Sequence, residues 1–227
     1  YGTLLFWPFS NERVTWNNIS IIDPIFTIPV LILIGIAIKT KRKIFSFFSI
    51  GWIIFYLSLG FIQYERALST ANDLAESRGH NPERLTLKPS FGNLILWKSI
   101  YEYEKTFYVD AIRTVQSSTV CLGESIKIFD YQEHLPDLDK ESQQAIDIER
   151  FRWFSQDYLG FDEEKSLVTD VRYSMLPNQI EPMWGLVIDD LRDTNEHAIW
   201  WTGRDVDESQ WNLFVKMLGG KECKVQS

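Results

Sequence analysis

The chain has 227 residues, a formal net charge of −8 and 15% aromatic residues. The charge is unevenly spread, because the part up to Tyr64 has five Lys/Arg and two Asp/Glu, while the part from Glu65 onward has eighteen and twenty-nine. An acidic domain repels phosphate backbones, so this balance argues against nucleic-acid binding. The second part is long enough to form one domain of ordinary size.

The first eighteen residues are dense in aromatic side chains. Trp and Tyr favour the headgroup layer of a membrane, where the ring is buried and its polar edge stays hydrated. Pro8 and the pair Ser10-Asn11 interrupt regular structure in this segment. We therefore expect residues 1–18 to lie along the outer membrane interface. The aromatic residues are Tyr1, Phe6, Trp7, Phe9 and Trp16.

Two apolar stretches follow, over residues 19–38 and 44–62, and Asp23 is the only charged residue inside them. A helix needs about 20 apolar residues to cross a bilayer, and both stretches have about that length. Residues 39–43 between them carry four cations, and loops this basic stay in the cytoplasm. The pattern predicts a transmembrane hairpin with a cytoplasmic turn, so that residues 1–64 form a membrane region. A buried helical hairpin of a soluble protein is the alternative.

Asp23 and Pro24 stand at the start of the first apolar stretch. Proline is tolerated in a first helical turn, and an aspartate there can accept hydrogen bonds from unpaired N–H groups. Capping is thus the structural interpretation of Asp23. The functional interpretation is that an acidic group at membrane depth ligates a metal or orients a ligand, since such groups are costly and usually retained for a reason.

After Ile62 the pattern becomes that of an amphipathic helix up to Gly79, a residue typical of a helix C-terminus. Residues 65–227 then alternate in a way that predicts a soluble α+β domain with a mainly antiparallel sheet. The fold class is therefore an α-helical transmembrane hairpin followed by this domain, which we place outside the cytoplasm. We expect strands over 94–103, 106–115, 126–131, 167–175, 183–189 and 198–202, and helices over 139–158 and 207–218.

The two cysteines, Cys121 and Cys223, both fall in the predicted domain. Outside the cytoplasm a disulfide between them is allowed, although the sequence does not show that they are close. Two unpaired thiols are the alternative.

No complete catalytic motif is present. His80, His134 and His197 are far apart and lack metal-ligand spacing, and no nucleophile elbow, phosphate loop or Cys-x-x-Cys pair occurs. Asp170 and Arg172 fall on one face of a predicted strand, where they form either a cross-sheet pair or a polar binding spot. Asp170 and Arg172 are the binding candidates that the residues themselves offer.

Several stretches together resemble the YdjM-type family of membrane-bound metal-dependent hydrolases. The similarity covers most of the chain in collinear order, and the Trp-Pro-Phe-Ser and Asp-Pro blocks are its most specific parts. The matching residues are Tyr1-Gly2-Thr3, Trp7-Pro8-Phe9-Ser10, Ile22-Asp23-Pro24, Arg78-Gly79-His80, Lys88-Pro89-Ser90 with Gly92-Asn93, Arg172-Tyr173 with Met175-Leu176-Pro177, and Trp184-Gly185.

The resemblance implies a multi-pass protein of the bacterial inner membrane, in which this chain corresponds to the C-terminal two-thirds. The family's metal site depends on histidines of an N-terminal signature that this chain does not contain. Asp23 alone carries over, as a metal ligand or as a group behind one. The expected cofactor is a divalent metal, with zinc favoured, and this expectation rests on the resemblance only.

Two functions remain open at this point. One is a membrane-bound metal-dependent hydrolase of unknown substrate, with an ester or phosphoester as the conjectured class. The other is a membrane-anchored domain without catalysis that binds a ligand or an unidentified protein partner through the face of Asp170 and Arg172. In both, the lipid bilayer is a partner and nucleic acid is not.

Overall fold

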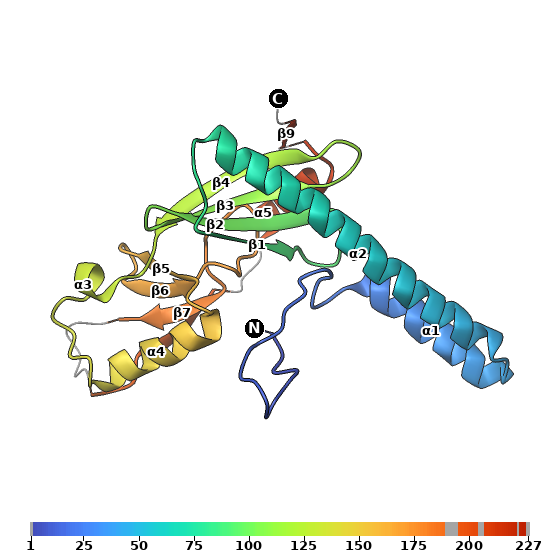
Figure 1. Ribbon diagram of the computed structural model, residues 1–227, viewed down its shortest axis with the longest axis horizontal. Coiled ribbons are helices and arrows are strands. Elements are labelled where there is room, and N and C mark those ends of the chain that lie inside the picture. Colours follow the sequence, from blue (N-terminus) through green and yellow to red (C-terminus); the bar gives the residue numbers. More distant parts are fainter. Residues whose placement is uncertain (1, 189–194, 204–206, 222, 226–227) are drawn as a thin grey trace.

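The computed structural model describes residues 2–188, 195–203, 207–221 and 223–225. A hairpin of two helices projects from an α+β body (Figure 1). Helix α1 spans Pro24–Thr40 and helix α2 spans Ile44–Ser77. The basic turn between them lies at the tip of the hairpin, farthest from the body. Helices followed by antiparallel sheets agree with the predicted fold class in its coarse form.

Helix α1 begins five residues later than the start of the predicted apolar span, because Asp23 is extended and caps the helix while Pro24 occupies its first position. Its 17 residues measure roughly 26 Å. Among the described residues, α2 is the one helix that is long and apolar enough to cross a membrane by length and composition. This finding alone is weak support for a membrane span, since core helices of soluble proteins meet the same criteria.

The two halves of α2 have different surroundings. The second half packs on a sheet through Ala67 and Ala71, which contact Trp97 and Ile112 and are fully buried, since small side chains let the helix approach closely. The outer half and α1 expose large apolar side chains around their surface. These are Ile25, Ile28, Leu31, Ile32, Ile34, Ile38, Ile44, Phe47, Phe48, Ile50, Ile54, Phe55, Phe61 and Ile62.

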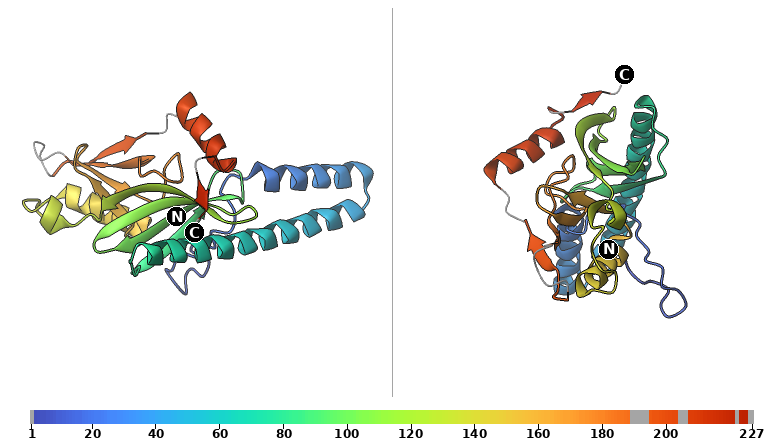
Figure 2. Two further views of the ribbon diagram at one scale, coloured as in Figure 1. Left: turned by 90° about the horizontal axis from the view of Figure 1, so that it is seen from above. Right: turned by 90° about the vertical axis from the view of Figure 1, so that its left-hand side faces the viewer.

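The larger sheet has five antiparallel strands in the order β1-β2-β3-β4-β9. The predicted hairpin around Glu104-Lys105 is confirmed, and both turn residues have positive φ, as a two-residue turn of this kind requires. Helices α2 and α5 cover opposite faces of this sheet (Figure 2). The strands are β1 Arg84–Pro89, β2 Leu96–Tyr103, β3 Thr106–Arg113, β4 Thr119–Lys127 and β9 Lys224–Val225, and α5 is Glu208–Leu218.

The second sheet has four antiparallel strands in the order β5-β6-β7-β8. It packs on helix α4 around Phe151, Leu159 and Val168, which form a core of their own. The strands are β5 Leu159–Asp162, β6 Leu167–Asp170, β7 Trp184–Val187 and β8 Ile199–Thr202, and the helices on this side are α3 Tyr131–His134 and α4 Gln143–Ser155.

Several predicted elements end at different residues. The strand predicted over 126–131 is wrong, because β4 ends at Lys127 and Asp130 caps α3. The strand predicted over 167–175 stops at Asp170, and the helix predicted from residue 139 starts after Ser142, which caps it. Part of the strand predicted over 183–189 is β7, and Asp189 lies outside the described residues.

Cys121 and Cys223 form a disulfide bond. The bond joins β4 to the segment that follows α5, next to the place where β9 pairs with β4. The question that the sequence left open is thereby answered in favour of the bonded pair.

Candidate functional site

Asp23 caps α1 and ties it to α2. Its Oδ1 accepts the N–H of Phe26 at 3.0 Å, and its Oδ2 accepts the hydroxyl of Tyr56 at 2.8 Å. Asp23 is 4% exposed, and both of its carboxylate oxygens are engaged. No group of three or more His, Cys, Asp or Glu that could hold a metal ion occurs among the described residues. The surroundings of Asp23 therefore fit the capping interpretation.

Asp170 and Arg172 form a buried ion pair, with side chains 0% and 1% exposed. Arg172 donates to Asp170 through Nη2 at 2.7 Å and through Nε at 2.9 Å. The remaining guanidinium donors reach the side chain of Gln156 and the carbonyl of Phe154. Asp170 ends β6 and Arg172 follows in a turn, so the pair is local and not the cross-sheet pair considered from the sequence.

Next to this pair, the structure places two lysines that the sequence did not single out as site residues. Lys88 on β1 and Lys98 on β2 are directly opposite each other in the register of the sheet, so their side chains share a face. Lys98 is 5% exposed and donates to Ser174 Oγ at 2.6 Å and to the carbonyl of Gln179 at 2.8 Å. Lys88 is partly exposed and donates to Asn17 Oδ1 at 3.0 Å.

Burial lowers the pKa of both amines. The pKa of Lys98 falls to about 7, with burial as the main cause and the carboxylates of Asp170 and Glu124 acting in the opposite direction. The pKa of Lys88 falls to about 8 through burial and the charge of Arg172, again against Asp170. An amine that is removed from water loses the hydration of its charged form, so protonation becomes unfavourable.

The charges of this cluster do not balance. Lys88, Lys98 and Arg172 bring three cationic groups to one place, and Asp170 is the buried carboxylate among them. Asp170 is already paired in a bidentate manner with Arg172. Buried charges are normally paired, because their desolvation costs several kcal/mol each. Asp170 and the exposed carboxylate of Glu124 offset this charge only in part, so loss of a proton or binding of an anion would stabilise the two lysines. We call Lys88, Lys98, Asp170 and Arg172 the cationic cluster.

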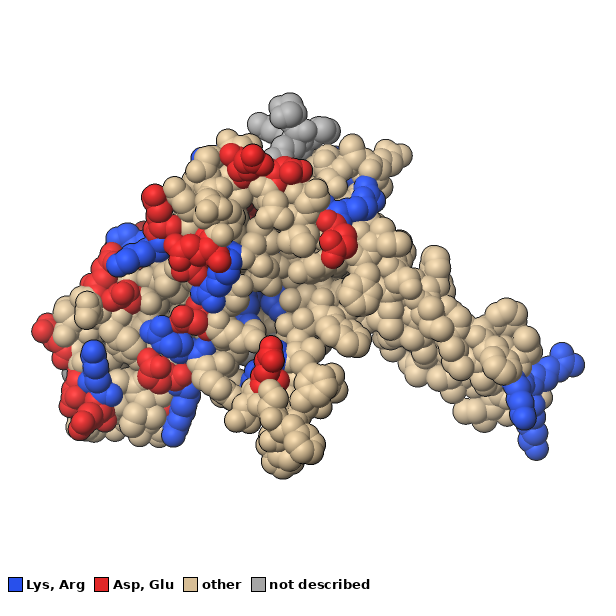
Figure 3. Space-filling view, in the orientation of Figure 1, with Lys and Arg blue, Asp and Glu red and all other residues tan. Residues whose placement is uncertain are grey.

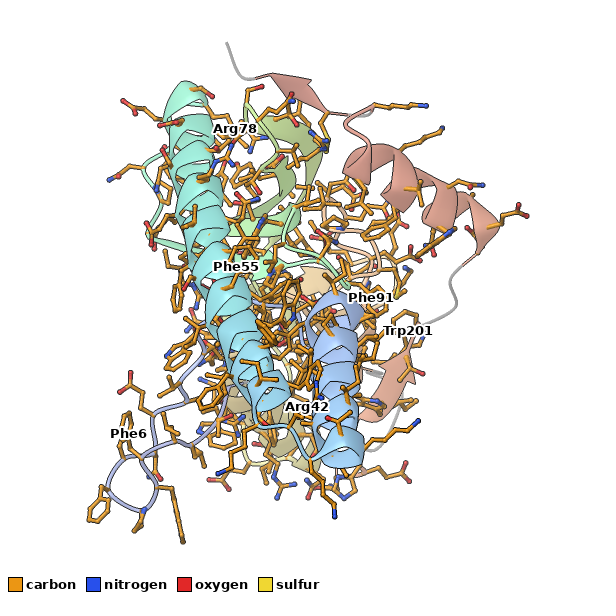
Figure 4. The ribbon with its side chains drawn as sticks, turned by 90° about the vertical axis from the view of Figure 1, so that its right-hand side faces the viewer. Phe6, Arg42, Phe55, Arg78, Phe91 and Trp201 are labelled. Atoms are coloured by element: carbon orange, nitrogen blue, oxygen red, sulfur yellow. A yellow bond between two sulfur atoms is a disulfide. The ribbon has the colours of Figure 1, made fainter. Side chains whose placement is uncertain are left out.

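The cationic cluster lies close to the start of the hairpin. Asn17, the partner of Lys88, belongs to the N-terminal segment, and the turn after β1 contacts the mouth of α1 through a hydrogen bond from Gly92 to Ile22. Figure 4 shows Phe91 of this turn beside the start of α1, and Phe6 on a loop that projects away from the body. The cluster thus belongs to the end of the body from which the helices emerge.

A shallow depression of about 460 Å³ lies between the N-terminal segment and the second half of α4. Gln156 lines it and also accepts the hydrogen bond from Arg172, so the depression reaches the edge of the cationic cluster. Figure 3 shows Lys and Arg atoms deep in a hollow between the body and the N-terminal loop. The other lining residues are Asn11, Arg13, Glu149, Arg152, Trp153 and Asp157.

A second polar cluster is built around Arg78 and His80 on the opposite face of the same sheet. Arg78 donates to both oxygens of buried Asp110, at 2.6 and 2.9 Å, and to the hydroxyl of Tyr101 at 3.0 Å. His80 Nδ1 lies 2.9 Å from the same hydroxyl. Gly79 allows this arrangement with φ of +73°. These groups satisfy one another, so the arrangement is that of a structural network between α2 and the sheet.

The missed lysines do leave a signal in the sequence. Lys98 interrupts the run Leu96-Trp97-Lys98-Ser99-Ile100, and Lys88 follows Leu85 and Leu87. A charged residue inside a buried strand is unusual unless it is paired. The sequence alone does not show that the two lysines face each other, since β1 was not predicted as a strand.

Comparisons of this chain with protein families, with curated proteins and with solved structures give no match.

Proposed function

We propose that the chain is a membrane-anchored module that binds a phosphate group at the outer membrane surface through the cationic cluster. The observation that carries the proposal is the pair of facing lysines beside one buried carboxylate, Asp170, which is already paired with Arg172. Lys and Arg are the usual phosphate-binding side chains in proteins. Lys88 is the accessible edge of the site, and Arg172 and the protonated fraction of Lys98 supply positive charge behind it.

The membrane anchor is supported by the surroundings of the hairpin. Its apolar side chains are exposed around both helices, which would be unfavourable in water and is favourable in lipid. The space-filling view shows a shaft almost free of charge with basic residues at its tip (Figure 3). Basic turns stay in the cytoplasm, so the body lies on the other side in this proposal. The disulfide fits such a location, because disulfides persist in oxidising compartments.

The N-terminal segment supports the same orientation. Leu5, Phe6, Trp7 and Phe9 are exposed on one loop, with Phe9 95% exposed. This loop projects from the body next to the base of the hairpin (Figure 1). In the proposal the loop rests in the headgroup layer of the outer leaflet, where aromatic side chains are favoured. The cationic cluster is then held close to lipid phosphates.

The metal-dependent hydrolase that the resemblance implies stays a prediction, with zinc as the expected ion. Asp23 gives it no support, since its two oxygens serve the start of α1 and Tyr56. Phosphate binding at the cationic cluster is independent of that prediction and needs no metal ion.

Thermal unfolding of the detergent-solubilised chain tests the proposal. Inorganic phosphate and glycerol phosphate are expected to raise the unfolding temperature over chloride at equal ionic strength, since a ligand that binds only the folded state stabilises it. In Lys88→Met this increase is expected to shrink to the level of the chloride control. Lys105→Met is the matched control, because Lys105 is an exposed lysine in the β2–β3 turn of the same sheet.

A second arm separates free phosphate from lipid headgroups. The same variants are compared in nanodiscs of phosphatidylcholine with and without phosphatidic acid. A stabilisation by phosphatidic acid that Lys88→Met removes assigns the site to lipid, and an effect of free phosphate alone assigns it to a soluble ligand. If neither probe stabilises the parent chain more than Lys88→Met, the proposed function is wrong.

A further inference from the structure

Ser174 lies against the buried amine of Lys98 and is partly exposed, which distinguishes it from a serine in the core. The Oγ of Ser174 is 2.6 Å from Lys98 Nζ, and the carbonyl of Gln179 holds the same amine at 2.8 Å. A hydroxyl within hydrogen-bond reach of a base that a third group orients is the arrangement of an activated nucleophile. Neither residue was singled out from the sequence.

We infer that Ser174 and Lys98 form a serine–lysine dyad that hydrolyses a carboxylic ester whose phosphate group is held by Lys88. The inference rests on the proposed function, which supplies the phosphate site, and adds a reaction to it. Serine–lysine pairs are one of the known variants of the activated serine nucleophile.

The protonation of Lys98 suits a general base. A lysine with its ordinary pKa is fully charged at neutral pH and cannot accept a proton. With a pKa of about 7, Lys98 is close to half neutral at that pH. The charged groups that face it are Asp170 and Glu124, which favour its cationic form, and Lys88 directly across the sheet. Catalytic bases work best when their pKa lies near the operating pH.

The hydrogen bonds of Ser174 define its resting state. Its hydroxyl donates to the carbonyl of Leu176 at 2.6 Å, while its oxygen accepts from the Lys98 ammonium. When Lys98 loses its proton, its lone pair becomes an acceptor at the same short distance. The hydroxyl proton then needs only to turn from the Leu176 carbonyl to Lys98 Nζ.

The reaction balances with water as the only co-reactant. Lys98 accepts the Ser174 proton as Oγ forms a bond to the acyl carbon, and the ester C–O bond breaks. The leaving alkoxide takes the proton from Lys98 and departs as an alcohol. Water then gives a proton to Lys98 and its hydroxyl to the acyl carbon, and the bond between Ser174 Oγ and the acyl carbon breaks, which releases the carboxylic acid. Ser174 finally recovers its proton from Lys98.

The groups that surround the dyad indicate which class of ester it would hydrolyse. Lys88 lies beside Lys98 in the sheet, so a phosphate bound there sits close to the dyad. The exposed residues Ile21, Ile22 and Phe91 at the mouth of the hairpin offer an apolar surface to an acyl chain. The substrate is therefore an amphiphile that has an acyl ester and a phosphate-bearing headgroup.

Labelling with a fluorophosphonate probe tests the dyad in the full chain, in detergent micelles with intact disulfide. We expect Ser174 to be labelled, and labelling to be lost in Ser174→Ala and Lys98→Met. Ser125→Ala, which changes an exposed serine of β4, is expected to label normally. Hydrolysis of p-nitrophenyl butyrate is expected to fall about 100-fold or more in the first two variants. EDTA is expected to leave the rate unchanged, which separates this chemistry from a metal-dependent one.

Lys98→Arg is the control that separates loss of the base from loss of folding. Arginine keeps the positive charge, but it stays protonated and cannot act as a base. This variant is expected to remain folded by thermal unfolding and to lose labelling. Labelling that persists in Ser174→Ala, or unchanged labelling in a folded Lys98→Arg, would overturn the dyad. Phosphate stabilisation is measured in the same variants. If it survives in Ser174→Ala while the parent chain shows no labelling, the dyad fails and the phosphate site stands.

Discussion

At the scale of single residues, the free-energy cost of burying two facing lysines makes the stability of the cationic cluster depend on pH. Both amines have an ordinary pKa of 10.5 and lower values in the folded chain, about 8 for Lys88 and about 7 for Lys98. Between about pH 7 and pH 10.5 the unfolded chain therefore binds more protons than the folded chain. The penalty is complete below about pH 7, and it disappears as the pH rises to 10.5.

This linkage predicts that the free energy of unfolding rises with pH between about 7 and 10, in buffers without phosphate. In the double variant Lys88→Met/Lys98→Met, the rise is expected to be largely removed, because methionine has no charge to desolvate. Thermal unfolding followed by tryptophan fluorescence at several pH values measures the effect. Lys105→Met should keep the slope of the parent chain. Equal slopes in the parent and the double variant would show that the lysines do not carry this buried charge.

At the scale of elements, the contact between Asp23 and Tyr56 joins the two helices of the hairpin near the body. Asp23→Ala removes a helix cap and this hydrogen bond together, and is expected to lower the stability of the solubilised chain by about 1–2 kcal/mol. Tyr56→Phe removes the hydrogen bond alone and should cost about 1 kcal/mol. Thermal unfolding of both variants and of the double variant measures the coupling.

The double variant distinguishes a structural from a metal-binding Asp23. If the two groups act through each other, the effects of Asp23→Ala and Tyr56→Phe are not additive. Metal content is measured in the same samples. A metal ion that is present in the parent chain and absent from Asp23→Ala, with full content in Tyr56→Phe, would contradict the capping role argued for Asp23.

Elements with strong local signals could be predicted from the sequence. The β2–β3 hairpin follows from two alternating runs around Glu104-Lys105, and α5 follows from its cap Asp207 and its apolar stripe. Strand β9 was missed because it has two residues and pairs with β4, about a hundred residues earlier in the chain. Strands β1 and β5 were also missed, although each pairs with the next strand along the chain. The prediction of a strand over 126–131 was wrong because it did not take into account that Asp130 caps α3.

The candidate site was predictable only in part. Asp170 and Arg172 were found because they alternate beside apolar residues, and the structure confirms that they contact each other. Lys88 and Lys98 could not be paired from the sequence, since the pairing depends on the register of β1 against β2. Ser174 is 76 residues from Lys98 in the sequence, and only the fold brings its hydroxyl to the Lys98 amine.

At the scale of the whole molecule, the disulfide and the helical hairpin both bear on which side of the membrane the α+β body lies. The bond between Cys121 and Cys223 closes a segment of about a hundred residues and ties the end of the chain to β4. Removing a disulfide of this kind usually costs about 2–5 kcal/mol. Its formation in the cell requires an oxidising compartment. The apolar hairpin with its basic tip places the body in such a compartment only if both helices cross the bilayer.

If both helices cross the bilayer, a reporter after Lys41 is expected in the cytoplasm and a reporter at the C-terminus outside it.

In the same cells, Cys121 and Cys223 should resist thiol-labelling reagents until they are reduced. Cys223→Ser should make Cys121 reactive in denatured protein and lower the unfolding temperature, because the end of the chain is no longer held against β4. Reporters on one side of the membrane would exclude the hairpin as a double span. Free thiols at both positions in freshly prepared protein would place the body in a reducing compartment, and the phosphate site would then face lipids of the inner leaflet.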